Sequence, residues 1–239
     1  NGMSSSATEL QKYLSYWDKY KGLWEMDKEV YIRKYAKANR SPSQFDVDVT
    51  KYKQQQAEII AETSSHAINF VRVDCNVMKD GLVGHTLQFQ NHLTGLLHDN
   101  SLNELKDIMK LFKNSSDELV QLPRDLDELS TKINLRKKLN ETLNDVNMRF
   151  DPLREMYDTL LKFDVAIPED ELGHLGNINE SFSEHKSMLT AAEKSLEKSK
   201  VSMKRNLEEQ MEEYSQSVTE TRDTSKQDLP FKADIAMED

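Results

Sequence analysis

The residues with the greatest capacity for chemistry are six histidines and a single cysteine, Cys75. A zinc-binding helix places two histidines four residues apart, because that spacing puts both rings on one face. His85 and His92 are seven residues apart and could share a helix face, but no two histidines have the four-residue spacing. A lone cysteine excludes an internal disulfide and favours a reducing, intracellular setting. We therefore predict no metal site, and we interpret Cys75 as a small packing residue.

A glycine-rich stretch from Gly81 to His85 comes nearest to a phosphate-binding loop. It lacks the Lys-Ser/Thr pair that holds phosphates and magnesium, and it lies within a helical pattern. Acidic residues are frequent, but no irregular segment would hold two carboxylates at a fixed distance. We therefore predict no catalytic residue, no cofactor-binding residue and no cofactor, so the chain is expected not to be an enzyme.

Composition and charge exclude two further classes of function. The 239 residues carry a net charge of −10, with +2 in the first 60 residues and −12 in the remainder. An acidic chain repels phosphate backbones, so nucleic acid is not expected as a partner. No apolar run reaches the roughly 18 residues that a membrane span needs, so we predict no membrane insertion. The low numbers of glycines (7) and prolines (5) favour long helices.

Apolar residues in the first half recur at helical spacings of three, four or seven. The pattern predicts a helix over residues 8–38, a second from Ser43 onward, a third capped by Asp74 that ends near residue 97, and a fourth over residues 101–117. Residues 68–74 alternate like a strand, but no other segment could pair with them, so we predict no sheet.

An aromatic stripe follows the first of these helices, with Trp17 and Trp24 one heptad apart. Its helical spacing favours a helix–helix core over a binding surface. We predict that both tryptophans pack in this core, against Phe45, Val49 and Phe70. The stripe consists of Leu10, Tyr13, Trp17, Tyr20, Trp24, Tyr31 and Tyr35.

Pro123 marks the clearest joint in the chain, because proline suits the first turn of a helix. A helix is predicted over residues 124–162, with a kink near Phe150 caused by Pro152. A last helix is predicted from Pro168, since three acids after a proline are typical of a helix N-terminus. Its apolar seam repeats as a near-heptad. The seam consists of Leu175, Ile178, Phe182, His185, Leu189, Ala192, Leu196, Ser199, Met203, Leu207, Met211, Tyr214 and Val218.

These patterns predict an all-α fold of elongated, consecutive helical bundles with long antiparallel, coiled-coil-like helices. We predict two domains, an N-terminal helical bundle over residues 1–121 and a long antiparallel helical hairpin over residues 122–239. On the last helix a basic cluster from Lys194 to Arg205 precedes an acidic cluster from Glu208 to Glu213. The two clusters are either a solvated exterior or a charge-patterned contact with a neighbouring chain.

Several stretches resemble the N-terminal tail of dynein heavy chains. Residues 16–28, YWDKYKGLWEMDK, resemble the family's W..Y..LW..DK motif, and residues 45–52, FDVDVTKY, resemble FD..I..Y. Residues 68–74, INFVRVD, resemble I.FI.ID, and the segment from Pro152 to Glu171 fits the last tail helices. At Leu229 the chain departs from the family's GPF motif, which here reads Leu-Pro-Phe. The resemblance covers nearly the whole chain and is closer to axonemal than to cytoplasmic heavy chains.

The resemblance implies a non-catalytic tail (stem) segment of an axonemal dynein heavy chain, in which residues 122–239 lead toward the linker of the motor. Such a segment would be a structural spacer and a docking surface in microtubule-based ciliary motility, with ATP hydrolysis in later parts of the heavy chain. The implied partners are dynein intermediate and light chains or neighbouring heavy chains, with the doublet microtubule reached indirectly. The implied location is the cytoplasm and cytoskeleton, in the axoneme of a cilium or flagellum.

Two alternatives stay open at this point. A spectrin-like helical-repeat scaffold of the cytoskeleton would show self-similarity at a fixed period, whereas Trp17 and Trp24 have no later counterparts. The other alternative is the equivalent tail segment of a cytoplasmic dynein.

Overall fold

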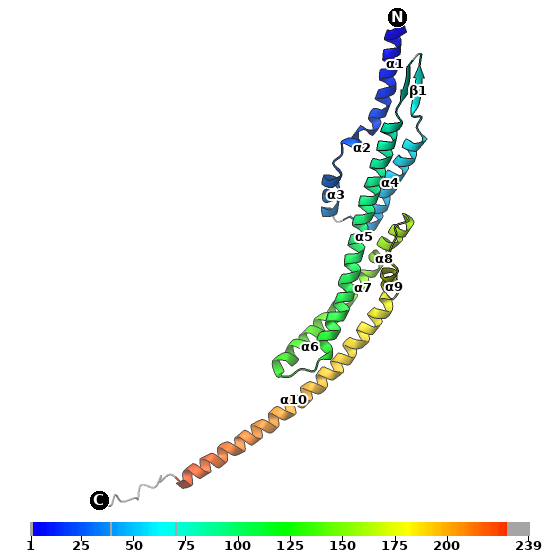
Figure 1. The fold of residues 1–239 in the computed structure, drawn as a ribbon. Coiled ribbons are helices and arrows are strands. Elements are labelled where there is room, and N and C mark those ends of the chain that lie inside the picture. The colour runs from blue at the N-terminus through cyan, green and yellow to red at the C-terminus, as the bar shows by residue number, and fades with distance from the viewer. Residues whose placement is uncertain (1, 39, 70, 229–239) are drawn as a thin grey trace, which may run out of the picture. The chain divides into compact units, whose positions relative to one another are not determined.

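The chain is seen in a computed structural model that describes residues 2–38, 40–69 and 71–228, with side chains described for 6–38, 40–69 and 71–227. Within these ranges the chain is helical apart from one pair of short strands and the connecting segments (Figure 1). The all-α prediction is confirmed, because helices carry both cores described below.

The chain forms two compact units, and each unit combines two separate stretches of sequence. The first unit contains Asn1–Met109 and Asp145–Ile178, and the second contains Lys110–Asn144 and Asn179–Asp239. The predicted division into a helical bundle over residues 1–121 and a helical hairpin over residues 122–239 stays a prediction.

The first unit begins with four short helices rather than the single helix predicted for residues 8–38. They are α1 (Gly2–Tyr16), the 3-10 helix η1 (Trp17–Tyr20), α2 (Lys21–Glu25) and α3 (Lys28–Lys37). The break before α3 occurs at Asp27, whose carboxylate accepts a hydrogen bond from the backbone N–H of Val30 at 3.0 Å. An aspartate in this role starts a new helix from an extended backbone, and Asp27 has φ −69° and ψ 110°. The aromatic spacing continues across the break, so periodicity alone did not reveal it.

The two tryptophans of the aromatic stripe lie in different environments. Trp17 is 2 % exposed, so its predicted place in the core is confirmed. Trp24 is 37 % exposed, and the prediction that it is a core residue is wrong. The reason is that η1 winds with about three residues per turn, which rotates the following residues and turns Leu23 inward instead. Phe70, a predicted neighbour of both tryptophans, lies outside the described residues.

The next helix, α4 (Pro42–Ala61), begins one residue before its predicted start at Ser43. The hydroxyl of Ser41 accepts from the backbone N–H of Gln44 at 3.4 Å, and Pro42 occupies the first turn, where a missing N–H costs nothing. Its buried residues are Phe45, Val49, Tyr52 and Ile59.

Two strands follow α4 and form an antiparallel hairpin, β1 (Ser65–Ile68) and β2 (Val71–Asp74). The prediction of no sheet is therefore wrong. The partner strand, β1, lies immediately before β2, and its four residues are too few to show a pattern of their own. In the observed register Ser65 pairs with Asp74. Asn69 follows β1 with φ 53°, a left-handed conformation that asparagine tolerates in tight turns.

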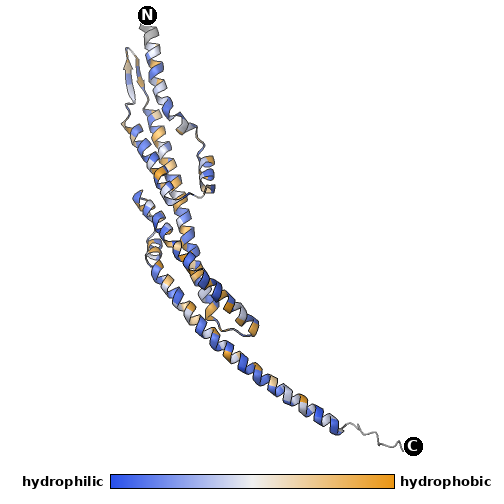
Figure 2. Ribbon diagram, turned by 180° about the vertical axis from the view of Figure 1, so that it is seen from behind, coloured by the Kyte–Doolittle hydropathy of each residue, from blue (hydrophilic) through white to orange (hydrophobic). Residues whose placement is uncertain are grey.

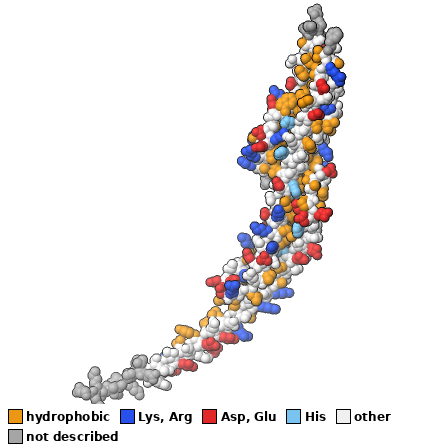
Figure 3. Space-filling view, viewed as in Figure 1, with side chains coloured by type: hydrophobic (Ala, Val, Ile, Leu, Met, Phe, Trp, Pro, Cys, Tyr) orange, Lys and Arg blue, Asp and Glu red, His pale blue; other side chains and the backbone are white. Residues whose placement is uncertain are grey.

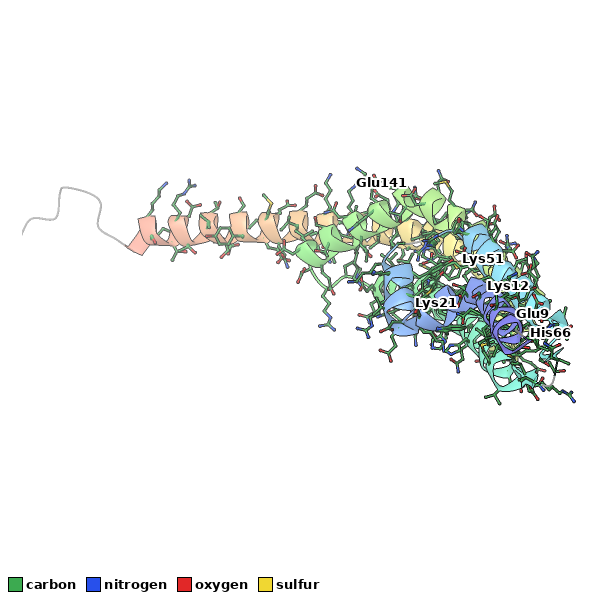
Figure 4. The ribbon with its side chains drawn as sticks, turned by 90° about the horizontal axis from the view of Figure 1, so that it is seen from above. Glu9, Lys12, Lys21, Lys51, His66 and Glu141 are labelled. Carbon is green, nitrogen blue, oxygen red and sulfur yellow. The ribbon has the colours of Figure 1, made fainter. Side chains whose placement is uncertain are left out.

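The hairpin packs against α1 through one aromatic contact. Tyr13 stacks on His66 with ring centroids 4.9 Å apart. Figure 4 labels His66 at the same end of the first unit as Glu9 and Lys12 of α1. The Tyr13 hydroxyl also donates to the backbone carbonyl of Thr63 at 3.1 Å. His66 is thus held in a packing contact between the hairpin and α1.

After the hairpin, α5 (Asn76–Val120) is one continuous helix of 45 residues. The sequence predicts two helices here, with a gap near residues 98–100, and that prediction is wrong. The hydroxyl of Ser101 donates to the carbonyl of His98 at 2.9 Å, so this serine is satisfied inside the helix instead of ending it. The predicted cap is confirmed, since the Asp74 carboxylate accepts from the backbone N–H of Asn76 at 2.9 Å.

The segment predicted as one kinked helix over residues 124–162 consists of three helices. They are α6 (Leu126–Glu141), α7 (Leu143–Met148) and α8 (Phe150–Lys162). The break before Phe150 agrees with the predicted kink, two residues before Pro152. The break at Thr142 was not predicted, because the apolar spacing on either side of it stays helical.

The last predicted helix is also divided, into α9 (Glu169–Gly176) and α10 (Ile178–Asp228). α9 begins after Pro168, as predicted. Asn177 separates the two helices with φ −90° and ψ 3°. It directly follows Gly176, and Gly173 lies one turn earlier, so two glycines weaken the helix here. α10 is 51 residues long.

Each unit has its own core. The core of the first unit combines aromatic rings with aliphatic side chains, and Tyr52 of α4 stacks on Phe89 of α5 with centroids 4.9 Å apart. The second unit contains an aliphatic core cluster from α5, α6 and α10, besides the buried rings of Phe112 and Phe182. The cluster consists of Leu119, Leu129, Leu139, Leu189, Ala192 and Leu196.

Candidate docking surface

The second unit is held together by a seam along α10. The buried seam residues of α10 are Phe182, His185, Leu189, Ala192 and Leu196. Steps of three and four residues place these side chains on one face of the helix, which packs against the leucines of α5 and α6. The predicted seam is therefore confirmed for this part of α10.

Charged side chains fix α6 in this arrangement. Arg136 of α6 forms an ion pair with Glu193 of α10 at 2.9 Å. Lys132 is buried, and its ammonium donates to the carbonyl oxygens of Glu118 and Gln121 at 2.7 and 2.8 Å. Those carbonyls lie at the C-terminal end of α5, where a cation is stabilised by the unpaired carbonyl groups.

His185 interrupts the apolar seam with a titratable ring. The ring stacks on Phe112 with centroids 4.8 Å apart, and its Nδ1 lies 3.5 Å from the hydroxyl of Ser115. Burial lowers the pKa of His185, because desolvation penalises the imidazolium. The neutral ring therefore serves as a packing residue.

Beyond Met203 the same face of α10 is exposed. The apolar side chains there are Leu207, Met211, Tyr214 and Val218, which are 46 %, 65 %, 73 % and 48 % exposed. We name these four residues together with Met203 the α10 stripe. At about 100° per residue, its steps of four, four, three and four residues keep all five side chains within an arc of about 80°.

The α10 stripe is visible in two views. Figure 2 shows apolar residues recurring among hydrophilic ones along the C-terminal half of α10. Figure 3 shows hydrophobic side chains at the surface of this half, beside acidic and basic ones. A contiguous set of large apolar side chains in solvent is typical of an interaction surface.

Charged residues flank the α10 stripe. Two pairs are neutralised within the helix, Lys204 with Glu208 at 3.7 Å and Arg205 with Glu209 at 3.0 Å. Among the described residues no side chain pairs with Glu212 or Glu213. The acidic cluster predicted from the sequence is thus partly uncompensated and lies beside the exposed apolar face.

A shallow hollow lies on the other side of α10. It is lined by Lys194, Glu197, Lys198, Val201, Ser202 and Arg205. These residues include three members of the predicted basic cluster, Lys194, Lys198 and Arg205. Val201 among them is 62 % exposed. The hollow is formed by a single helix, so it offers no enclosed site for a small molecule.

The first unit contains a buried carboxylate, Glu171 of α9. It accepts hydrogen bonds from the Nε2 of His98 at 3.0 Å and from the hydroxyl of Tyr157 at 3.2 Å. Burial raises the pKa of Tyr157 to about 12. The three side chains satisfy one another and link α5, α8 and α9, which is a structural role. Sequence spacing gave no sign of this cluster, because its members are far apart in the chain.

Two tests for other classes of site can be made on the described ranges. They contain no group of three or more histidine, cysteine or acidic residues placed to hold a metal ion. In the same ranges no helix combines the length and the apolarity required to cross a membrane. Cys75 is buried and forms no disulfide.

A predominantly helical fold with a long seam helix and an exposed continuation of that seam defines a coiled-coil type of helical segment. The family model described as dynein axonemal heavy chain 2/5/8 coiled-coil matches residues 91–211, which run from the middle of α5 into the α10 stripe. This chain belongs to that family.

Known dynein heavy chains are similar over most of the chain. The Dynein-1-beta heavy chain of the flagellar inner arm I1 complex from Chlamydomonas reinhardtii is 28 % identical over 100 % of this chain. Dynein axonemal heavy chain 2 from Mus musculus is 30 % identical over 87 % of it. The Dynein gamma chain of the flagellar outer arm from Chlamydomonas reinhardtii is 20 % identical over 84 %. The chain spans about 4–5 % of the length of these relatives.

Proposed function

We propose that this chain is a non-catalytic stem segment of an axonemal dynein heavy chain and acts as a structural spacer and an assembly surface. The observation that carries the proposal is the family match over residues 91–211, which includes both the packed seam of α10 and the start of its exposed continuation. A segment that only filled space would not need large apolar side chains in solvent.

We further propose that the segment works in the axoneme of a cilium or flagellum. The relatives are named for flagellar inner and outer arms, which supports this location. Its partners would be dynein intermediate and light chains or neighbouring heavy chains, with the doublet microtubule reached through them. A cytoplasmic dynein tail and a spectrin-like scaffold are the less favoured candidates, because the matching family model is axonemal.

The proposal can be tested in a flagellated cell that makes the full heavy chain. Removal of residues 91–211 in frame should prevent incorporation of the heavy chain into the axoneme. The ATPase activity of the extracted heavy chain should be retained, which shows that the motor region still folds. Normal incorporation of the shortened heavy chain would contradict the proposal.

A further inference from the structure

The α10 stripe continues a face that already binds helices. Between Phe182 and Leu196 this face of α10 is covered by α5 and α6. From Leu207 to Val218 the face keeps its apolar character and lacks a covering helix among the described residues. The exposed part spans about three turns, so one helix of similar length would cover it.

The covered part shows what kind of helix fits this face. α6 supplies leucines to the seam and an arginine beside it, Arg136, which pairs with Glu193 of α10 at 2.9 Å. The exposed part repeats this arrangement on the α10 side. Glu208 directly follows Leu207 and Glu213 directly precedes Tyr214, so carboxylates lie on both flanks of the α10 stripe.

A second copy of this chain does not fit the same face. The α10 stripe runs from residue 203 to residue 218, and the acidic cluster Glu208–Glu213 lies at its centre. Two copies with fully overlapping stripes would therefore bring the two acidic clusters to the same level, whether the helices run parallel or antiparallel. Residues 203–228 also hold seven acids against four bases. Repulsion between the two facing acidic clusters disfavours a dimer of this kind.

We propose that the α10 stripe binds an amphipathic helix of another polypeptide that carries lysines and arginines on both flanks of its apolar face. This inference rests on the proposed stem function and names the chemistry of the partner. The apolar seam supplies the contact area. The flanking bases neutralise Glu213, and they compete with Lys204 for Glu208, to which Lys204 is only loosely paired at 3.7 Å.

Two synthetic helical peptides of about three heptads test this pairing. Both have leucine at the seam positions; one has lysine at every flanking position and the other has glutamate. Binding of the fluorescently labelled peptides to the full chain is measured by anisotropy. The lysine peptide should bind at least about ten-fold more tightly than the glutamate peptide, and the preference should shrink as salt rises and screens the charges.

Three variants of the chain separate the contribution of apolar contact to peptide binding from the contribution of charge. Met211→Ser with Val218→Ser should weaken binding of the lysine peptide at least about ten-fold, since both lost side chains are seam residues. Glu208→Gln with Glu213→Gln should remove most of the preference for lysine over glutamate. Val201→Ser changes an apolar residue of similar exposure on the other side of α10 and should leave binding unchanged. All the altered residues are exposed, and circular dichroism verifies that each variant is folded.

Equal binding of both peptides, or no binding of the lysine peptide, would overturn the inference. Concentration-dependent dimerisation of the chain in light scattering that Met211→Ser and Val218→Ser abolish would also overturn it, because the occupant would then be a second copy. Such a result leaves the stem proposal standing if the heavy chain still needs residues 91–211 to enter the axoneme. The stem proposal itself would be contradicted by a different result, namely normal incorporation of the shortened heavy chain into the axoneme.

Discussion

At the scale of single residues, Trp17 and Trp24 form a matched pair of the same type in different environments. Trp17 is 2 % exposed and Trp24 is 37 % exposed. Trp17→Ala should lower the free energy of unfolding by about 3–5 kcal/mol, as truncation of a buried large aromatic does. Trp24→Ala should cost about 1 kcal/mol or less, because half-exposed side chains lose little on truncation. Urea unfolding compares the two, and equal costs would contradict the assignment.

His185 gives the second unit a dependence on pH. Burial lowers its pKa in the folded state, whereas the unfolded chain has an ordinary histidine pKa of about 6.5. The unfolded chain therefore binds more protons just below that pH, and stability should fall as the pH drops below about 6.5. Above that pH the ring is neutral in both states and contributes no slope.

The measurement compares the chain with His185→Gln, which cannot titrate. The loss of unfolding free energy between neutral and mildly acidic pH should be smaller in the variant. His85, whose pKa burial and Lys28 also lower, is present in both proteins and cancels in the comparison. The same loss in both proteins would show that His185 does not contribute.

At this scale the sequence predicted some sites and missed others. Cys75 is a buried packing residue, as its isolation in the sequence indicated. The Glu171–His98–Tyr157 cluster was missed, because it joins residues from three helices and no local spacing connects them. The orientation of Trp24 was missed because a single 3-10 turn changes the helical phase, and periodicity assumes a constant one.

At the scale of elements, a glycine in the interior of α5 lowers the stability of this long helix. Gly95 is exposed in its interior, and a Cβ atom placed there would meet no other atom within 4 Å. Gly95→Ala should therefore raise the free energy of unfolding by about 0.5–1 kcal/mol, because alanine loses less backbone entropy in a helix. Chemical denaturation measures the change. A destabilised variant would contradict the presence of a continuous, freely exposed helix at Gly95.

The element boundaries show where sequence patterns succeed and fail. Three starts marked by a capping residue or proline were found, at Pro42, Asn76 and Glu169. The start predicted at Pro123 was wrong, because Asp125 caps α6, which begins at Leu126. Internal breaks at Asp27 and Thr142 were missed, because apolar spacing continues across them. The hairpin was rejected for want of a partner, since a four-residue strand carries too few residues to show its own periodicity.

The seam of α10 was predicted as one uniform feature, but the structure separates it into a covered and an exposed part. Periodicity reports which face is apolar and cannot report whether a neighbouring helix is long enough to cover it. The candidate docking surface therefore required the structure, whereas its residues were all present in the predicted seam.

At the scale of the whole molecule, charge governs the approach to other polymers. Residues 164–239 hold 18 acids and nine bases, and the whole chain has a net charge of −10. Microtubule surfaces are also acidic, so bare contact should be repulsive within the screening length of about 8 Å at physiological salt. We expect the purified chain to stay in the supernatant when bare microtubules are sedimented. Tight pelleting without any other subunit would show that this segment itself is an anchor.

The chain is also expected not to bind ATP. The stretch from Gly81 to His85 lies inside α5, where backbone N–H groups are engaged in the helix and cannot cradle phosphates. Isothermal titration with Mg-ATP should therefore give no saturable heat at micromolar concentrations. A saturable isotherm would require a nucleotide site that this helical geometry does not provide.

The interleaving of the two units constrains how the chain can be made. His98 and Glu171 touch although 73 residues separate them, and both belong to the first unit. A ribosome releases the chain from its N-terminus, so the first unit remains without α8 and α9 until after the whole first stretch of the second unit has emerged. During translation the core of the first unit therefore stays incomplete until α8 and α9 have been synthesised. Nascent chains that stall before residue 145 should expose aromatic surface to chaperones, whereas chains that pass residue 178 can close it.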